Sequence, residues 1–468
     1  MKTLLLLAAC AAPAFCADAP PAAPLEAPAP EAHAQPDAKP DAKSDTKPEA
    51  KAESRPAPKS EAKSILPDVA APKPVTVEDE WAFVKAAGHD ENADVRKAAV
   101  PELELFARRR PDAPQAPDAL LMAADLRQKS GDWPRAMGDL LRLIAAYPGS
   151  SALLNAKSDF LSLVAKHAPR RDQPALSALP ESLEGADTVD RLSQVWRRVA
   201  DRAPDALYEP VVRGIDDLFA RDPGRGDTDE LLQALARLHA ANGEPASALL
   251  SWRKLLALCP ASMLRPVAQM SIGDLYADAL RDPRAAIAAY QELAEKFPRA
   301  IQVQSALEKS AALFENKLHQ YDLAVEQLER VVTLFPNTPA SLRALQSIAR
   351  LQRDRLNNPD AAIKTLQRLS KMHGGQDGVK ALLLAAEIAR RDLKDSGRQA
   401  ALLHQVADDY PAAQQSPEAL YDCAGVWEDA GNTVKAIEVY KEVATKFPSD
   451  RYARKASDRV AKLSAAKP

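Results

Sequence analysis

The stretch that decides the fold is residues 271–298, SIGDLYADALRDPRAAIAAYQELAEKFP, because its pattern recurs in the chain without a gap. A shift of 38 positions aligns it with residues 309–336, and a shift of 76 aligns it with residues 347–374. All three copies carry an alanine followed by a β-branched apolar residue at the same place. A match of the sequence to itself at a fixed period is typical of repeat proteins, in which neighbouring units stack and share one core.

Residues that end helices follow the same period. Aromatic–proline pairs recur as Tyr147-Pro148, Phe297-Pro298, Phe335-Pro336, Tyr410-Pro411 and Phe447-Pro448. Between Pro336 and Pro411, the period predicts a further helix end, and Gly374 stands there. Three other glycines, Gly131, Gly243 and Gly431, each lie five residues before an alanine. Proline and glycine both terminate helices. We therefore expect two helices in each period, with a turn between them and a stop after the second.

Small and large side chains alternate at positions where two such helices would touch. A small residue lets two helices approach closely, and a large residue one turn further on fills the space between them. The residues predicted to make these packing contacts and stops are Gly273, Tyr276, Ala286, Tyr290, Pro298, Ala324, Pro336, Ala362, Trp427, Ala436, Tyr440 and Pro448.

This pattern resembles the tetratricopeptide repeat family, over roughly residues 100–150 and 226–450. The resemblance implies an all-α, right-handed superhelix (an α-solenoid) whose concave groove holds segments of other proteins. We divide the body into N-terminal helical repeats at 76–225, regular repeats at 226–450, and a capping helix with a tail at 451–468.

Prolines break the rhythm between residues 149 and 225, so we expect irregular repeats there and a bend in the superhelix. The spacing from Pro148 to Pro260 leaves room for two hairpins in this stretch, with helices at 151–166 and 188–201.

The first 75 residues carry signals of export. A basic start and an apolar run predict a secretory signal peptide at 1–16. Leu7-Ala8-Ala9-Cys10 also fits a lipobox, which would place a lipidated Cys10 at the mature N-terminus; a third interpretation leaves the start uncleaved. We favour cleavage near Cys16, because the apolar run before Cys10 is short. Residues 17–75 are rich in Ala, Pro and charged residues, so we expect a disordered linker.

Composition and motifs argue against nucleic-acid binding, a metal site and the common catalytic motifs. With 62 Lys and Arg against 65 Asp and Glu, no bulk basic field draws the chain to nucleic acid. The seven histidines form no pair at i, i+4 and no HExxH motif, and the chain has no GxSxG or phosphate-binding loop. We predict no catalytic residue, no metal site and no cofactor. Cys259 and Cys423 are expected to be buried thiols too far apart for a disulfide.

These observations predict an exported, non-catalytic scaffold of the bacterial cell envelope that binds other envelope proteins. The hairpins resemble those of exported repeat proteins in outer-membrane barrel assembly and in Tol–Pal-associated division. A pilus or secretion assembly lipoprotein is an alternative. A lytic transglycosylase with a helical superhelix is another, for which Glu181-Ser182 is a weak match. We expect a periplasmic location, with membrane contact only through a lipidated Cys10, and the sequence does not identify the partner-binding residues.

Overall fold

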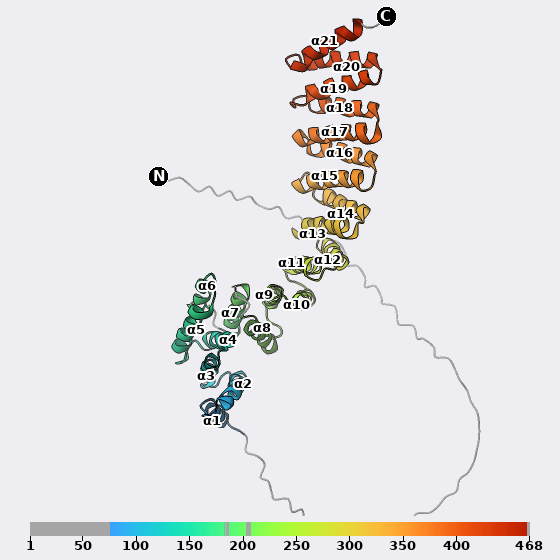
Figure 1. Ribbon diagram of the computed structural model, residues 1–468. Coiled ribbons are helices and arrows are strands. Elements are labelled where there is room, and N and C mark those ends of the chain that lie inside the picture. Colours follow the sequence, from blue (N-terminus) through green and yellow to red (C-terminus); the bar gives the residue numbers. More distant parts are fainter. Residues whose placement is uncertain (1–74, 182, 184–186, 203–206, 466–468) are drawn as a thin grey trace, which may run out of the picture. The chain divides into compact units, whose positions relative to one another are not determined.

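The computed structural model describes residues 75–181, 183, 187–202 and 207–465, which belong to one compact unit, Lys73–Pro468 (Figure 1). The described residues form 21 α-helices joined by turns and contain no β-strand. They are arranged as an all-α solenoid of helical hairpins. We call the first helix of each hairpin its A helix and the second its B helix. None of the described helices combines the length and the apolar character needed to cross a bilayer. The predicted signal peptide, Cys10 and nearly all of the linker lie outside the described residues.

The regular hairpins begin at residue 228, and each helix packs on the helix before it and the helix after it. Their helices are α9 (Thr228–Ala241), α10 (Pro245–Leu258), α11 (Arg265–Asp274), α12 (Pro283–Lys296), α13 (Gln302–Leu313), α14 (Tyr321–Leu334), α15 (Pro339–Asp354), α16 (Pro359–His373), α17 (Gly375–Ile388), α18 (Ser396–Asp409), α19 (Ser416–Asp429) and α20 (Thr433–Lys446). The stack ends in α21 (Arg451–Ala465), the expected capping helix.

The alanines predicted to pack between helices are completely buried. Ala286, Ala324, Ala362 and Ala436 each have a relative exposure of 0%. Tyr290 lies four positions after Ala286 and Tyr440 four positions after Ala436, and both rings are buried. Tyr276 and Trp427 on the A helices are half-buried. The structure thus places small and large side chains where the repeat pattern predicts helix contacts.

Gly273 permits a very close contact between the A helix α11 and the B helix α12. A Cβ atom on Gly273 would lie 2.3 Å from the ring of Tyr290, which is closer than two such atoms approach in proteins. The Tyr290 hydroxyl donates a hydrogen bond to Asp274 at 2.6 Å, beside this contact. Only glycine therefore fits at this position without displacing the ring.

The aromatic–proline pairs stand directly after the B helices. Phe297, Phe335 and Phe447 are the C-cap residues of α12, α14 and α20. The prolines that follow them, Pro298, Pro336 and Pro448, are exposed. Each proline stops the helix because it has no backbone N–H to donate and restricts the residue before it.

Turns of more than one kind join the A and B helices, and the sequence indicated only the kind that contains glycine. The turns after α9 and α19 contain Gly243 and Gly431 with φ of 78° and 74°. By contrast, α11, α13 and α17 continue into single π-helical turns, η3 (Leu275–Ala279), η4 (Phe314–Leu318) and η5 (Ala389–Leu393). After these, a non-glycine residue takes the left-handed conformation: Arg281, His319 and Lys394 have φ of 53–54°. These residues carry a backbone strain that glycine does not.

The N-terminal part departs from the regular stack. Its helices are α1 (Val77–Gly88), α2 (Ala93–Arg109), α3 (Ala116–Lys129), α4 (Trp133–Ala146), α5 (Leu153–His167), α6 (Gln173–Ser177), α7 (Thr188–Arg202) and α8 (Tyr208–Arg221), with a short 3₁₀ turn η1 (Leu179–Glu181). Helices α5 and α7 occupy the two ranges expected for helices. The stretch has room for two hairpins and holds α5–α6 and α7–α8, of which the first is short, because α6 has only five residues. Pro174 stands in its first turn, and Pro180 follows soon after.

Helix α7 packs on α4 and not on α5, so the stack skips the α5–α6 segment. The Nε of Arg191 on α7 donates to the backbone oxygen of Ala145 on α4 at 2.8 Å. A Cβ on Gly138 of α4 would lie 2.9 Å from Pro210 of α8, which shows how closely these two helices approach. The α7–α8 hairpin thus takes the place that α5 and α6 would occupy in a regular stack, and α5 flanks it (Figure 1).

Candidate protein-binding groove

A groove of about 730 Å³ lies along the A helices of the N-terminal part. Its walls come from α1 and the start of α2, from α3, and from α5. The apolar floor is formed by Leu121 and Met122 of α3, which are half-buried, and by Leu126. A Cβ on Gly88, at the end of α1, would lie 2.5 Å from the sulfur of Met122, so this glycine lets α1 close onto the floor.

The rim of this groove is acidic. Asp118 and Asp125 lie seven residues, or about two turns, apart on α3, and Asp159 lines the same groove from α5. Burial raises the pKa of Asp159, and the negative charge of Asp125 raises it further. Lys129 is the cation at this rim, and its Nζ pairs with Asp125 at 2.7 Å. Arg96 also lines the groove, but its Nη1 donates to the backbone oxygens of Asp90 and Glu91.

A buried cluster of charged side chains joins α3, which forms the groove floor, to α2, α4 and α8. Arg127 of α3 bridges Glu104 of α2 and Asp139 of α4, and all three side chains are nearly inaccessible to solvent. Although burial opposes it, Arg127 holds the pKa of Glu104 below its usual range. Burial raises the pKa of Asp139 to about 7 despite Arg127, and the charge of Glu104 adds to the rise. Arg213 of α8 reaches Glu104 at 3.4 Å, so the cluster joins four helices.

This cluster could not be predicted from the sequence, because its members are separated by 12 to 109 positions and no local pattern connects them. Buried charges that satisfy one another in this way fix how helices pack, and they leave no group free to react. The cluster is therefore part of the scaffold.

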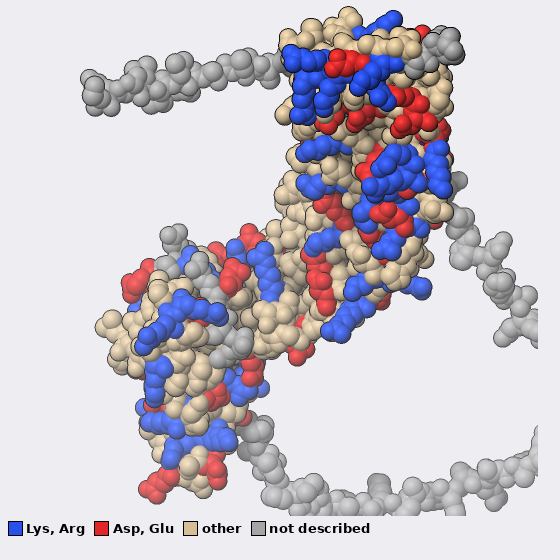
Figure 2. Space-filling view, turned by 45° about the horizontal axis from the view of Figure 1, so that its top comes forward, with Lys and Arg blue, Asp and Glu red and all other residues tan. Residues whose placement is uncertain are grey.

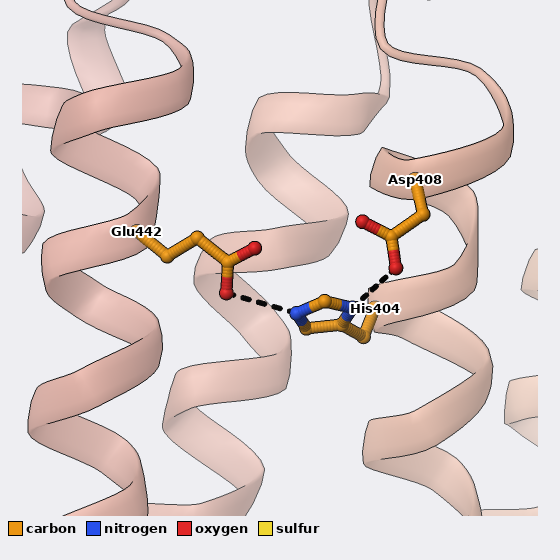
Figure 3. A group of neighbouring side chains, drawn as sticks. All are labelled: His404, Asp408 and Glu442. Atoms are coloured by element: carbon orange, nitrogen blue, oxygen red, sulfur yellow. Dashed lines mark hydrogen bonds and ion pairs between the residues drawn. The ribbon is translucent and has the colours of Figure 1, made fainter.

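A second charged group, on the B helices of the C-terminal part, has the composition of a metal site (Figure 3). Nδ1 of His404 lies 2.8 Å from Asp408, one turn later on α18, and Nε2 lies 2.9 Å from Glu442 on α20. The ammonium of Lys446 lies 2.7 Å from both carboxylates. Although burial opposes it, Lys446 lowers the pKa of Asp408 and of Glu442. The two carboxylates thus already have a cation between them, and the arrangement is that of an ion-pair cluster.

Ion pairs between successive hairpins repeat along the regular stack. On the A helices they join residues 35 positions apart, as in Asp274–Lys309 and Glu315–Arg350. On the B helices the separation is 38 or 39 positions, as in Asp408–Lys446 and Glu329–Arg368. On the face drawn in Figure 2, blue and red side chains alternate over the C-terminal helices. The repeat spacing is therefore visible in charged residues as well as in the apolar, proline and glycine positions.

Glu181, the residue considered for transglycosylase chemistry, is exposed. It ends η1 and pairs with Lys157 at 3.0 Å, while its side chain is 78% accessible. A catalytic acid needs a desolvated site that raises its pKa. Glu181 does not meet this requirement, and Ser182 lies outside the described residues.

Both described cysteines are free thiols. Cys423 is buried, and burial raises the pKa of its thiol to about 12. Cys259 was expected to be buried as well, but it is only half-buried, because it is the C-cap residue of α10 and lies in the turn before α11.

The tetratricopeptide repeat family model matches residues 118–150, which contain most of the α3–α4 hairpin, and residues 267–300, which contain most of α11–α12. These two stretches are therefore similar to tetratricopeptide repeats, and the described part of the chain is an all-α solenoid of helical hairpins. The first match includes the floor and the acidic residues of α3 at the groove.

Several solved structures are similar to the chain. A tetratricopeptide repeat protein from Parabacteroides merdae shows 14% identity and a TM-score of 0.30, over 58% of this chain and 98% of its own. The MamA protein shows 20% identity and a TM-score of 0.29, over 39% of this chain and 91% of its own. PilF of Pseudomonas aeruginosa shows 16% identity and a TM-score of 0.28, over 50% and 98%. No curated protein sequence matches the chain. Similarity of fold at this level does not define a function.

Proposed function

We propose that this chain is a non-catalytic scaffold that binds other proteins along the A helices of its hairpins. The observation that carries the proposal is the α1–α3–α5 groove, which has an apolar floor and a polar rim on the A-helix side of a tetratricopeptide-type solenoid. Helices that present such a groove bind extended or helical segments of a partner. The two charged clusters outside it pair internally and serve packing.

Site-specific photo-cross-linking of the full chain tests this function. A photoreactive amino acid at exposed Ser158, inside the groove, is compared with the same amino acid at exposed Glu326 on the B helix α14. We expect discrete cross-linked partners from position 158 and none from position 326. Identical products from both positions, or none from either, would contradict a role of the A-helix side.

We further propose that the scaffold works in the bacterial cell envelope, in outer-membrane assembly, in division, or in a pilus or secretion complex. This proposal rests on the sequence of residues 1–16, which has the features of an export signal. The chain is then periplasmic after cleavage near Cys16, or bound to the outer membrane if Cys10 is lipidated.

Fractionation of cells that express the full chain or its Cys10→Ala variant decides between the two locations. We expect both proteins in the soluble periplasmic fraction, because the described helices offer no membrane span. A wild-type chain that fractionates with membranes, and a variant that does not, would show lipidation, since acyl chains contribute about 0.8 kcal/mol per buried methylene. Retention of both proteins in the cytoplasm would contradict export.

A further inference from the structure

Among the described helices, α4 and the short α6 pack on α5. In a regular stack the next A helix would cover α5, but here α7 packs on α4. Leu154 and Leu161 of α5 are 78% and 41% exposed. They share a stripe of the helix with Ser158, which lines the groove, because residues three and four positions apart lie on one face. The apolar surface of the groove therefore continues over its edge onto α5.

The charge at the groove is negative and only partly compensated. In the described part of the chain, neither Asp118 nor Asp159 has a lysine or arginine nitrogen within 4 Å of its carboxylate. Lys129 is paired with Asp125, and Arg96 is held by two backbone oxygens. Burial raises the pKa of Asp159, and the nearby charge of Asp125 raises it further. A partner that brings a positive charge removes this repulsion, whereas a phosphate-rich nucleic acid or an anionic membrane increases it.

The carboxylates at the rim do not converge on one point. In the described part of the chain, the group whose ligand atoms come within 4.8 Å of one another is His404, Asp408 and Glu442, far from this groove in the sequence. Separate carboxylates beside leucine and methionine side chains suit an elongated ligand that carries several charges and apolar groups.

We propose that the α1–α3–α5 groove binds a basic amphipathic segment of a partner protein, with lysine or arginine at Asp118 and Asp159 and apolar side chains on Leu121, Met122 and the exposed leucines of α5. The proposal rests on the scaffold function proposed above and gives that function a partner chemistry. Helix-in-groove recognition uses this combination of apolar anchors and flanking charges. Recognition therefore depends on both the sign of the charge and the apolar stripe.

The test is fluorescence anisotropy of the full chain with a labelled helical peptide that has leucines at every third and fourth position and lysines between them. The control peptide has glutamate in place of every lysine. We expect the lysine peptide to bind, its affinity to fall as salt is added, and the glutamate peptide not to bind. Equal binding of both peptides, or of neither, would overturn the proposal.

Variants of the chain locate the binding site. Asp118→Asn combined with Asp159→Asn should weaken binding of the lysine peptide roughly tenfold or more, because two charge contacts are lost. The matched control, Glu295→Gln combined with Glu326→Gln, removes the same charge from exposed positions on α12 and α14 and should bind like the wild type. Leu154→Ser combined with Leu161→Ser should weaken binding too, and circular dichroism verifies that each variant is folded.

Two results separate this inference from the scaffold function. If the aspartate variant binds the lysine peptide as the wild type does, the inference is wrong. If cross-links from position 158 still form in that variant with natural partners, the groove binds proteins of another chemistry and the scaffold function stands. If the peptide binds in the groove but position 158 yields no natural partner, the charge preference holds and the scaffold proposal fails.

Discussion

The N-terminal part, residues 76–225, and the regular hairpins, residues 226–450, hold their helices together in different ways. The regular hairpins repeat one packing pattern, in which a fully buried alanine on the B helix faces the A helix. Ion pairs on the surface join one hairpin to the next. The N-terminal part instead buries charges between four helices and skips the α5–α6 segment. In the N-terminal part, exposed leucines on α5 adjoin the α1–α3–α5 groove, and this combination makes it the candidate site for a partner.

The largest difference between the two parts should appear when one arginine is removed from each. Arg127→Met leaves Glu104 and Asp139 buried without their cation, and we expect it to destabilise the chain by about 3–5 kcal/mol. Arg350→Met breaks the exposed pair with Glu315 and should cost about 0–1 kcal/mol. Urea unfolding followed by circular dichroism measures both changes. Similar effects of the two substitutions would mean that the buried cluster does not set the packing of the N-terminal part.

A smaller effect is expected from overpacking the regular hairpins. Ala286→Trp and Ala362→Trp insert a large ring where no side-chain surface is exposed, and each should destabilise by about 1–3 kcal/mol or more. The control Lys364→Ala lies on the exposed side of α16 and should stay within about 0.5 kcal/mol. The same urea titrations give the comparison, and tolerance of tryptophan at both sites would show that the buried alanines are not tight contacts.

The stability of the N-terminal part should fall as the pH rises. The folded chain keeps a proton on Asp139, whose pKa burial raises to about 7, whereas an unfolded aspartate loses it near pH 4. The stabilisation from this proton is therefore complete below about pH 4 and is lost as the pH rises towards about 7. Urea midpoints at several pH values measure the decline.

Asp139→Asn is the matched variant, because asparagine keeps the size of the side chain and cannot ionise. Its midpoint should change less with pH over the same range than that of the wild type. An equal pH dependence in both proteins would assign the effect to other groups.

The smallest effects concern the turns between A and B helices. Lys394→Gly should stabilise the chain by about 1 kcal/mol, because glycine adopts the left-handed conformation at φ 53° without strain. Gly431→Ala should destabilise it by a similar amount at φ 74°, where a Cβ meets no atom within 4 Å and the cost is in the backbone alone. Thermal melts of the two variants test the pair, and a shift of the same sign in both would contradict it.

The apolar period in the sequence was enough to predict the hairpins, because packing in a solenoid is local. Ala286, Tyr290 and Gly273 contact one another within one hairpin or its neighbour, and their spacing records this directly. The π-helical turns could not be predicted, because Arg281 and Lys394 adopt a conformation that their residue types disfavour.

The groove could not be predicted from the sequence either. Its residues come from α1, α3 and α5, and the side of α5 away from α4 stays exposed because α7 packs on α4. Nothing in the local pattern of residues 149–225 specifies that choice. The acidic residues Asp118, Asp125 and Asp159 therefore looked like ordinary solvated positions on separate helices.

Hydrogen–deuterium exchange of the full chain, with and without the lysine–leucine peptide at saturation, tests the central claim most directly. We expect slower exchange in α3, residues 116–129, and in α5, residues 153–167, with no change in the regular hairpins from 228 to 446. Slower exchange confined to the regular hairpins would contradict the proposal, because the peptide would then bind outside the α1–α3–α5 groove.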